Sequence, residues 1–289
     1  MEDALAKSVR RHAASARMLG AESIPCYPSA SRREIPAPPP ATEVTGAPPI
    51  ESARPKGRRD DAPVVEAGVH SSPAGAGVIR EAKPRGGREE RAKLLDDLRA
   101  RYESDAPHKR FVTAFTNIVF GDGDPCARLM FVGEAPGAEE DRTGKPFVGR
   151  AGELLNKMIG AMGLDRGQVY IANVLKTRPP DNATPTSFEI DLCRPYLMEQ
   201  IEIIGPEAIV ALGLPASRAL LGTDESMGRM RGRWHSTRLP SGGEVAVMPT
   251  YHPAYVLRNY TEDTRAKVWA DLKMAMDRLG LSGPAGKKA

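Results

Sequence analysis

The feature that most constrains this chain is a polar, glycine-rich segment, residues 133–152, which joins a short apolar run to a helical pattern. The apolar run, residues 128–132, predicts a buried strand, and the apolar spacing of residues 153–159 predicts a helix. In open α/β sheets ligands bind at the carboxyl ends of strands. Glycines let a ligand approach the backbone closely there, and prolines stiffen the loop. The segment therefore predicts an α/β fold with a ligand site at this strand end.

Strands and helices alternate along the rest of the chain. The strands are expected near residues 129–132, 169–174, 208–211 and 244–248. The helices are expected near residues 88–102, 151–162, 188–204 (kinked or restarted at Pro195), 215–221 and 262–279. Such alternation favours a parallel sheet covered by helices on both faces. We therefore predict an α/β fold, a three-layer α/β/α sandwich with a small central parallel sheet.

Composition divides the chain into three parts. Residues 1–87 are dominated by Ala, Pro, Gly, Ser and scattered Arg. Such a segment cannot bury enough apolar surface to offset the entropy lost on ordering, so it is expected to be a disordered tail. The folded domain is expected at residues 88–281, and residues 282–289 are expected to be a disordered C-terminus.

Charge and hydropathy restrict the location and the partners. The net charge of +4 and the pI of about 9.0 fit binding to a polyanion without establishing it. Lys and Arg interrupt the apolar residues between positions 4 and 19, which argues against a secretory signal. No run approaches the ~20 apolar residues of a membrane span. We expect a cytoplasmic monomer without a membrane partner.

Residues 133–152 match neither the dinucleotide fingerprint nor the phosphate-binding P-loop. They resemble the first motif of the uracil-DNA glycosylase superfamily, in the variant of family 4, its thermostable bacterial and archaeal branch. Residues 173–182 resemble the family segment N-V-x-K-C-R-P-P-x-N, with Thr177 in place of the cysteine. Residues 252–258 resemble the second motif, H-P-[SA]-x-x-L-R. The resemblance covers roughly residues 117–280 and implies the same α/β/α sandwich.

The resemblance implies a uracil-binding site at Gly133, Phe147 and Asn173. Asn173 matches the asparagine that recognises the base, and an amide offers both a donor and an acceptor for that purpose. Phe147 matches the aromatic residue that stacks on the flipped base, whereas in isolation it would be read as a core residue. Asn173 in isolation would be read as a strand-end residue that caps a turn.

The resemblance also implies two catalytic residues, Glu134 and His252. His252 matches a histidine that donates a hydrogen bond to a uracil carbonyl oxygen as negative charge develops there. Glu134 is expected to orient or activate water, or to stabilise the cationic sugar. The alternative for Glu134 is a solvated loop carboxylate, and for His252 a structural or solvated side chain.

DNA contacts are implied for five further residues, which are Lys176, Arg178, Val256, Leu257 and Arg258. Val256 and Leu257 resemble the apolar wedge that fills the space of the flipped base, and Arg258 is expected to hold a phosphate or the orphan base. For residues 256–258 the alternative is an ordinary helix start. Lys176 and Arg178 are expected to contact phosphate, with a merely solvated role as the alternative.

The cysteine count bears on the cofactor. Family 4 enzymes carry four cysteines that hold an iron–sulfur cluster, and such clusters usually need four thiolates. Aligned on residues 116–117, the family's other cysteine positions hold Ala106, Lys109 and Thr177, and only Cys193 remains where a ligand would be. We therefore predict that the cluster is absent and that no metal is bound.

The first functional hypothesis is a metal-free glycosylase that excises uracil from DNA and starts base excision repair. The second is a binding protein that holds DNA or uracil without turnover. The third is a glycosylase for another deaminated base, such as hypoxanthine. A further branch of the superfamily bonds covalently to the abasic sugar through a histidine in an Arg-rich insert, and the Arg-rich segment 229–235 is kept in view for that reason.

Overall fold

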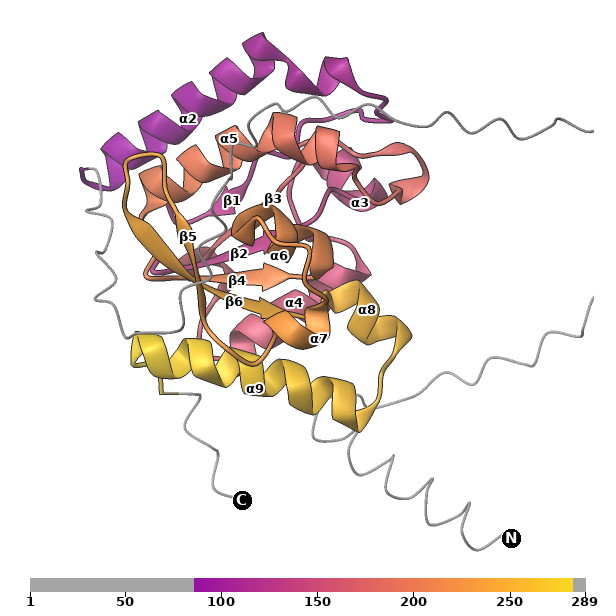
Figure 1. The fold of residues 1–289 in the computed structure, drawn as a ribbon. Coiled ribbons are helices and arrows are strands. Elements are labelled where there is room, and N and C mark those ends of the chain that lie inside the picture. The colour runs from indigo at the N-terminus through magenta and orange to yellow at the C-terminus, as the bar shows by residue number, and fades with distance from the viewer. Residues whose placement is uncertain (1–85, 283–289) are drawn as a thin grey trace, which may run out of the picture. The chain divides into compact units, whose positions relative to one another are not determined.

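The computed structural model describes residues 86–282 (Figure 1). Residues 1–85 and 283–289, which include nearly all of the expected tail and C-terminal segment, lie outside the described residues. The disorder expected for those two segments stays a prediction.

The described part of the chain forms a six-stranded sheet in the order β1-β3-β2-β4-β6-β5. The strands are β1 (Asp122–Gly123), β2 (Leu129–Gly133), β3 (Tyr170–Asn173), β4 (Ala208–Leu212), β5 (His235–Arg238) and β6 (Glu244–Thr250). β3, β2, β4 and β6 are parallel, which confirms the four predicted strands as the centre of the sheet. β1 and β5 pair antiparallel at the two edges, so the whole sheet is mixed. Neither edge strand carries an apolar run, and the sequence pattern therefore missed both.

Helices connect the strands and cover the sheet. The α-helices are α2 (Arg88–Asp105), α3 (Ala138–Thr143), α4 (Arg150–Ala161), α5 (Ser187–Ile204), α6 (Leu214–Leu221), α7 (Met227–Met230), α8 (Pro253–Arg258) and α9 (Glu262–Leu279). The short 3₁₀ helices are η1 (Pro107–Arg110), η2 (Arg166–Gln168) and η3 (Pro180–Asn182). The five predicted helices are present, and the shorter elements α3, α7 and α8 are additional.

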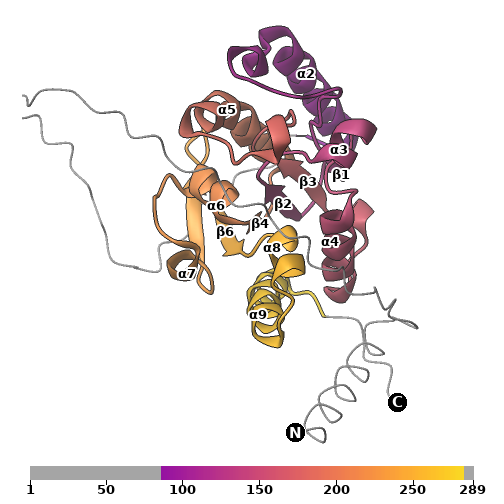
Figure 2. The same cartoon turned by 90° about the vertical axis from the view of Figure 1, so that its right-hand side faces the viewer.

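Alternate residues of β2 face opposite layers, as the period of a strand requires. Met130 and Val132 belong to the apolar cluster that includes α2, α5 and α6. Leu129 and Phe131 belong to the cluster that includes α4, α8 and α9. Figures 1 and 2 show α2 and α5 on one side of the sheet and α9 on the other. The three-layer α/β/α architecture is therefore confirmed.

α5 runs through Pro195 as one helix, where the sequence predicts a kink or a restart. A proline inside a helix removes one backbone hydrogen bond. Packing offsets this loss, because Leu197, Ile201 and Ile204 of the same helix are wholly buried. Its N-terminus is fixed by a capping box, in which the Thr186 hydroxyl accepts from the Glu189 amide and the Glu189 carboxylate accepts from the Thr186 amide.

The parallel strands bring the three motif segments to one edge of the sheet. β2, β3 and β6 end at Gly133, Asn173 and Thr250, so the segments that follow them meet at the carboxyl edge. Beyond the ladder the Val174 amide donates to the Gly133 carbonyl, and the Leu175 amide donates to the Glu134 carbonyl. These bonds hold the two loops together as they leave the sheet. Among residues 86–282, no helix combines the length and apolarity that crossing a membrane requires.

Candidate functional site

A cavity of about 380 Å³ opens at the carboxyl edge of the sheet. Its lining includes five of the residues predicted from the sequence, which are Glu134, Phe147, Asn173, His252 and Arg258. They lie at the end of β3 or in the segments that follow β2 and β6, which are far apart in the chain. The volume is within the range of small-molecule sites, and the lining mixes apolar surface with a few polar groups, as such sites usually do.

Gly133, the last residue of β2, is not part of the cavity lining but lies against two residues that are, Asn173 and Phe147. A Cβ at this position would lie 2.4 Å from Asn173 Oδ1 and 2.5 Å from Phe147 Cζ. Both distances are well inside van der Waals contact, so any side chain here would displace the amide or the ring. Glycine is therefore required at this position for Asn173 and Phe147 to face the same space.

Asn173 has an unsatisfied acceptor. Its side chain is only 1% exposed, and among the described residues its Oδ1 has no hydrogen-bond partner. Leaving a buried acceptor unpaired costs about 1–3 kcal/mol. Because Asn173 lines the cavity, a ligand with an N–H group can satisfy this oxygen.

Phe147 lies between the cavity and the core. Its side chain is 5% exposed and belongs to the apolar cluster under α4 and α9, and its ring also borders the cavity. The ring centroid is 5.5 Å from that of His252, with 34° between the planes. Its backbone φ is +50°, which is uncommon for a residue with a side chain. The core and stacking interpretations of Phe147 thus both describe part of its surroundings.

His252 precedes α8 and caps its first turn. Its Nδ1 accepts a hydrogen bond from the Ala254 amide at 3.1 Å. Burial, and to a lesser extent the charge of Arg258, lower the pKa of His252 to about 4, and Glu140 opposes this change. The imidazole is therefore neutral at pH 7, with Nδ1 as acceptor and the proton on Nε2. This arrangement leaves Nε2–H as a donor.

Glu134 follows β2 directly and is partly buried. Burial raises the pKa of its carboxyl group, and the nearby positive charge of Arg258 opposes that rise. A carboxylate with a raised pKa is a better proton acceptor than a solvated one. The site therefore combines a carboxylate, a neutral imidazole donor and an unpaired amide oxygen.

The structure contradicts the predicted phosphate contact of Lys176. Its side chain is wholly buried, and its Nζ donates to the Asn173 carbonyl oxygen at 2.8 Å and to Oε1 of Gln200. The ammonium lies 5.3 Å from the ring centroid of Phe120, and burial lowers its pKa to about 7. A group without solvent exposure cannot reach a phosphate, so this prediction is wrong. Lys176 instead holds the backbone of Asn173.

The predicted wedge at Val256 is also wrong. Val256 is 3% exposed and packs in the apolar cluster beneath α8. Leu257 is half-buried and Arg258 is exposed. The exposed apolar residue of this helix is Tyr255, at 39%, whose ring stacks on Tyr251 with centroids 4.9 Å apart. The motif gives the order of these residues but not which side of a six-residue helix faces the core.

Arg178 lies at the rim of the cavity. Its Nε donates to Oδ1 of Asn182 at 2.9 Å, and Asn182 lines the cavity. Asp181 and Asn182 both have positive φ, near +52°, so the chain turns sharply here. Arg178 is partly exposed, which leaves the predicted phosphate contact open to it.

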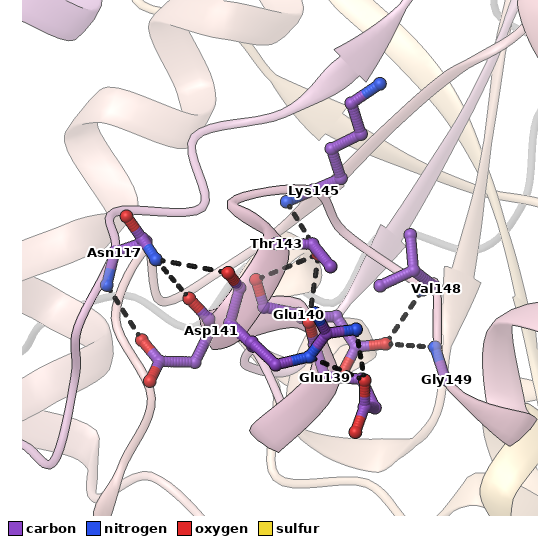
Figure 3. Close-up of polar contacts among 9 residues, drawn as sticks. Asn117, Glu139, Glu140, Asp141, Thr143, Lys145, Val148 and Gly149 are labelled. Atoms are coloured by element: carbon purple, nitrogen blue, oxygen red, sulfur yellow. Dashed lines mark hydrogen bonds and ion pairs between the residues drawn. The ribbon is translucent and has the colours of Figure 1, made fainter.

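Two residues that support the site were missed by the motif comparison. Glu140, in α3, accepts hydrogen bonds from the amides of Val148 and Gly149 (Figure 3). Arg166, in η2, donates to the carbonyl oxygen of Phe147 at 3.0 Å. Glu140 stands three residues after the N-cap Gly137 and accepts from its amide, but glycine lacks the hydroxyl of a capping box, so the sequence carries only half of that signature. No local pattern marks Arg166.

The positions of the family's cluster ligands do not fit an iron–sulfur cluster here. Cys193 and Thr177 are wholly buried, and the hydroxyl of Tyr102 lies beside them. Lys109 is exposed, and Ala106 has no group that could bind a metal. One thiol cannot replace the four thiolates that such clusters usually need. Within residues 86–282 no group of three or more His, Cys, Asp or Glu residues could hold a metal ion.

The Arg-rich segment 229–235 lies outside the cavity lining. Nε2 of His235 is 2.8 Å from the Met230 carbonyl oxygen. Arg231 pairs with the buried Asp271 at 2.9 Å, and its guanidinium lies over the ring of Tyr251. The segment thus supports the chain before His252 rather than supplying a group to the cavity.

Comparison with known proteins agrees with this geometry. The family model described as the uracil DNA glycosylase superfamily matches residues 120–273. A type-4 uracil-DNA glycosylase of Thermotoga maritima is 46% identical over 169 residues, 58% of this chain and 86% of that protein. Those of Pyrobaculum aerophilum and Archaeoglobus fulgidus are 46% and 41% identical, over 49% and 58% of this chain and 74% and 85% of their own lengths.

Proposed function

Because the chain belongs to the uracil DNA glycosylase superfamily, we propose that it excises uracil from DNA in the cavity at the carboxyl edge of its sheet. The reaction hydrolyses the N-glycosidic bond and leaves an abasic site, the first step of base excision repair. An enzyme that acts on a base must take it out of the stack, and a cavity of this size accepts a flipped base.

The observation that carries this proposal is the unpaired, buried Oδ1 of Asn173. Uracil presents an N3–H donor beside a carbonyl oxygen at O4, which an asparagine amide can match with one acceptor and one donor. Cytosine has no hydrogen on N3 and carries an amino group at C4. In the same position its N3 lone pair would face the amide oxygen, and its amino group would face the amide's own donor. The amide therefore favours uracil over cytosine.

His252 and Glu134 supply the chemistry. Uracil leaves as an anion, and the neutral imidazole can donate from Nε2 to the carbonyl oxygen on which the charge develops. Glu134 orients the attacking water or stabilises the positive charge that develops on the sugar. Phe147 provides an aromatic surface on which the flipped base stacks.

The rim of the cavity holds the DNA. Arg258 and Arg178 are accessible cations that fit phosphate or an orphan base, whereas Lys176 is buried. We assign the wedge to Tyr255 in place of Val256, because its ring is exposed and is supported from behind by Tyr251. Leu257 is the next residue and is half-buried, so it contributes less to the wedge than Tyr255 does.

We further propose that this chain folds without an iron–sulfur cluster. The Tyr102 hydroxyl lies beside Cys193 and Thr177, two of the four ligand positions, and its ring packs against His108 and Tyr196, with centroids 5.4 and 5.0 Å apart. Buried aromatic surface of this kind stabilises a fold without metal. The cytoplasmic location and the monomeric state stay predictions.

The test is strand cleavage by alkali after incubation of a labelled oligonucleotide that carries one uracil. Cleavage at uracil but not cytosine, suppressed by Glu134→Gln and by the nearly isosteric Asn173→Leu, is expected. Uracil-DNA that is bound but not cleaved would favour the binding protein, and cleavage at hypoxanthine in place of uracil would favour the third hypothesis. An elemental analysis of the purified chain that finds four iron atoms per molecule would contradict the cluster-free fold.

A further inference from the structure

The loop that carries Phe147 is held on both sides by side chains of opposite charge. We propose that Arg166 and Glu140 are positioning residues that together fix the Phe147 ring in the cavity wall, where the flipped base stacks. This inference rests on the proposed function and adds two residues, neither of which touches the base by itself in the mechanism above.

Arg166 holds the carbonyl side of the loop. Its Nη1 donates to the Phe147 carbonyl oxygen at 3.0 Å, and its Nη2 donates to the Pro146 carbonyl oxygen at 2.6 Å. A guanidinium carries five N–H donors in a rigid, planar fork, so it can bind two successive carbonyl groups at once. The two peptide planes on either side of the Phe147 Cα are therefore fixed by one side chain.

Arg166 is itself anchored to two other elements. Its Nε and Nη2 each lie 3.3 Å from Oδ2 of Asp122 in β1, and its Nη1 lies 3.1 Å from Oδ1 of Asn156 in α4. The side chain is only about a quarter exposed. Because the guanidinium is held by the edge of the sheet and by α4, it can transmit their rigidity to the loop.

Glu140 holds the amide side of the same loop. Its Oε1 accepts from the Val148 amide at 2.8 Å and from the Gly149 amide at 2.9 Å, as Figure 3 shows. Its Oε2 accepts from the Gly137 amide at 3.1 Å, which ties the carboxylate to the start of α3. Bonds from neutral amides to a carboxylate are stronger than those between neutral groups.

The backbone of Phe147 needs such support. Its φ of +50° is strained for a residue with a side chain, and strained conformations persist only where the surroundings impose them. α4 also packs closely beneath it, because a Cβ at Gly152 would lie 2.0 Å from the Phe147 carbonyl oxygen. The bonds of Arg166 before the turn and of Glu140 after it are placed to hold this conformation.

Of the two, Arg166 is the cleaner probe. It is not among the residues that line the cavity, so its influence on the base must pass through Phe147. Glu140 lines the cavity and raises the pKa of His252, so its removal would change the chemistry as well as the loop. The experiment therefore centres on Arg166.

The experiment is a double-mutant cycle on the rate constant for uracil excision with enzyme in excess. Arg166→Ala should lower that rate constant about tenfold, as expected for a weakened base–aromatic stack. In a Phe147→Ala background the same change should alter the rate constant by less than about twofold, because the ring through which Arg166 acts is gone. Equal losses in both backgrounds would overturn the proposal.

Arg128→Ala is the matched control. Arg128 also binds a carboxylate, Glu207, and a backbone carbonyl oxygen, that of Leu279, but it precedes β2 at the opposite end of the strand. Its removal should leave the excision rate constant unchanged. Tm is measured for every variant, and Arg166→Lys, which can still reach one carbonyl group, should recover part of the rate.

A second readout does not depend on activity. With 4-fluorophenylalanine at position 147, the parent and Arg128→Ala proteins should give the same single ¹⁹F resonance, and Arg166→Ala should shift or split it. An unchanged resonance in Arg166→Ala would overturn the proposal. A parent protein that excises no uracil would overturn the proposed function alone, since the resonance still reports whether Arg166 positions Phe147.

Discussion

The molecule contains two histidine–aromatic pairs of nearly the same geometry and different surroundings. Phe147 and His252 have ring centroids 5.5 Å apart at 34°, and Tyr102 and His108 have centroids 5.4 Å apart at 27°. Burial lowers the pKa of both histidines. The first pair borders the cavity, whereas the second is enclosed by further aromatic rings, among them Tyr196.

The comparison shows that an unpaired buried polar atom does not by itself mark a ligand site. Among the described residues, the Tyr102 hydroxyl and His108 Nδ1 lack hydrogen-bond partners, as does Asn173 Oδ1. The difference is that Asn173 lines a cavity of about 380 Å³ and Tyr102 does not. A ligand can satisfy the first oxygen, while the unpaired atoms of the enclosed pair remain a cost to stability.

The largest contrast is expected from removing the two histidines. His252→Ala should lower the excision rate constant by roughly 10²–10³-fold, the usual effect of losing one donor to a developing oxyanion. His108→Ala should lower Tm and leave the rate constant of the folded protein within about twofold. Rate constants with enzyme in excess, together with thermal melts, test both. Similar rate losses for the two variants would remove the distinction between the pairs.

Protonation of Glu134, which lines the cavity with Phe147 and His252, should cause the fall of the excision rate constant at low pH, the acid limb of the pH profile. The pKa of His252 is about 4 and that of Glu134 is raised above its ordinary value of 4.5, so Glu134 takes up a proton first as the pH falls. The excision rate constant should therefore fall about tenfold per pH unit below the pKa of Glu134, if its carboxylate is the active form. Glu134→Gln should lower the plateau and abolish this limb. A limb that persists in Glu134→Gln at the same pH would assign it to another group.

A change in the enclosed pair, Tyr102 and His108, should alter the stability of the fold and leave the rate of excision unchanged. Tyr102→Phe removes a buried hydroxyl that lacks a partner while keeping the ring and its contacts with His108 and Tyr196. The free energy of unfolding should rise by about 1 kcal/mol, and the excision rate constant should not change. Denaturant titration measures the first quantity. A loss of stability would mean that the hydroxyl is paired in solution, for example with Cys193 beside it.

Much of the fold and part of the site could be predicted from the sequence. The four central strands are largely apolar runs, which is typical of a parallel sheet buried on both faces, and the motif residues lie at or just after the ends of those strands. Since parallel strands end at one edge, Glu134, Asn173 and His252 had to come together once the strands were assigned. Local pattern and topology carry this information.

The remaining features depend on tertiary contacts that leave no local pattern. Lys176 carries a charge that suggests the surface, but Gln200 of α5, 24 residues away, provides a buried partner. Val256 and Tyr255 are neighbours on α8, and a rotation of 100° per residue places one in the core and the other in solvent. Arg166 meets the carbonyl group of Phe147 across 19 residues. Each of these contacts requires the packed structure.

The smallest expected effect is on the salt dependence of DNA binding, and it compares an accessible cation at the cavity rim with a buried cation near Tyr102. Arg258 is exposed at the cavity rim, whereas Lys176 lies beneath the surface against Phe120, which also contacts Tyr102. Each phosphate contact contributes about 0.9 to the slope of log K against log salt for duplex DNA. Arg258→Ala should therefore reduce that slope by about one contact's share, and Lys176→Met should leave it unchanged. Binding titrations with a duplex at several salt concentrations measure both slopes. A reduced slope for Lys176→Met would show that the Lys176 ammonium reaches DNA after all, which would require the packing around Phe120 and Tyr102 to open.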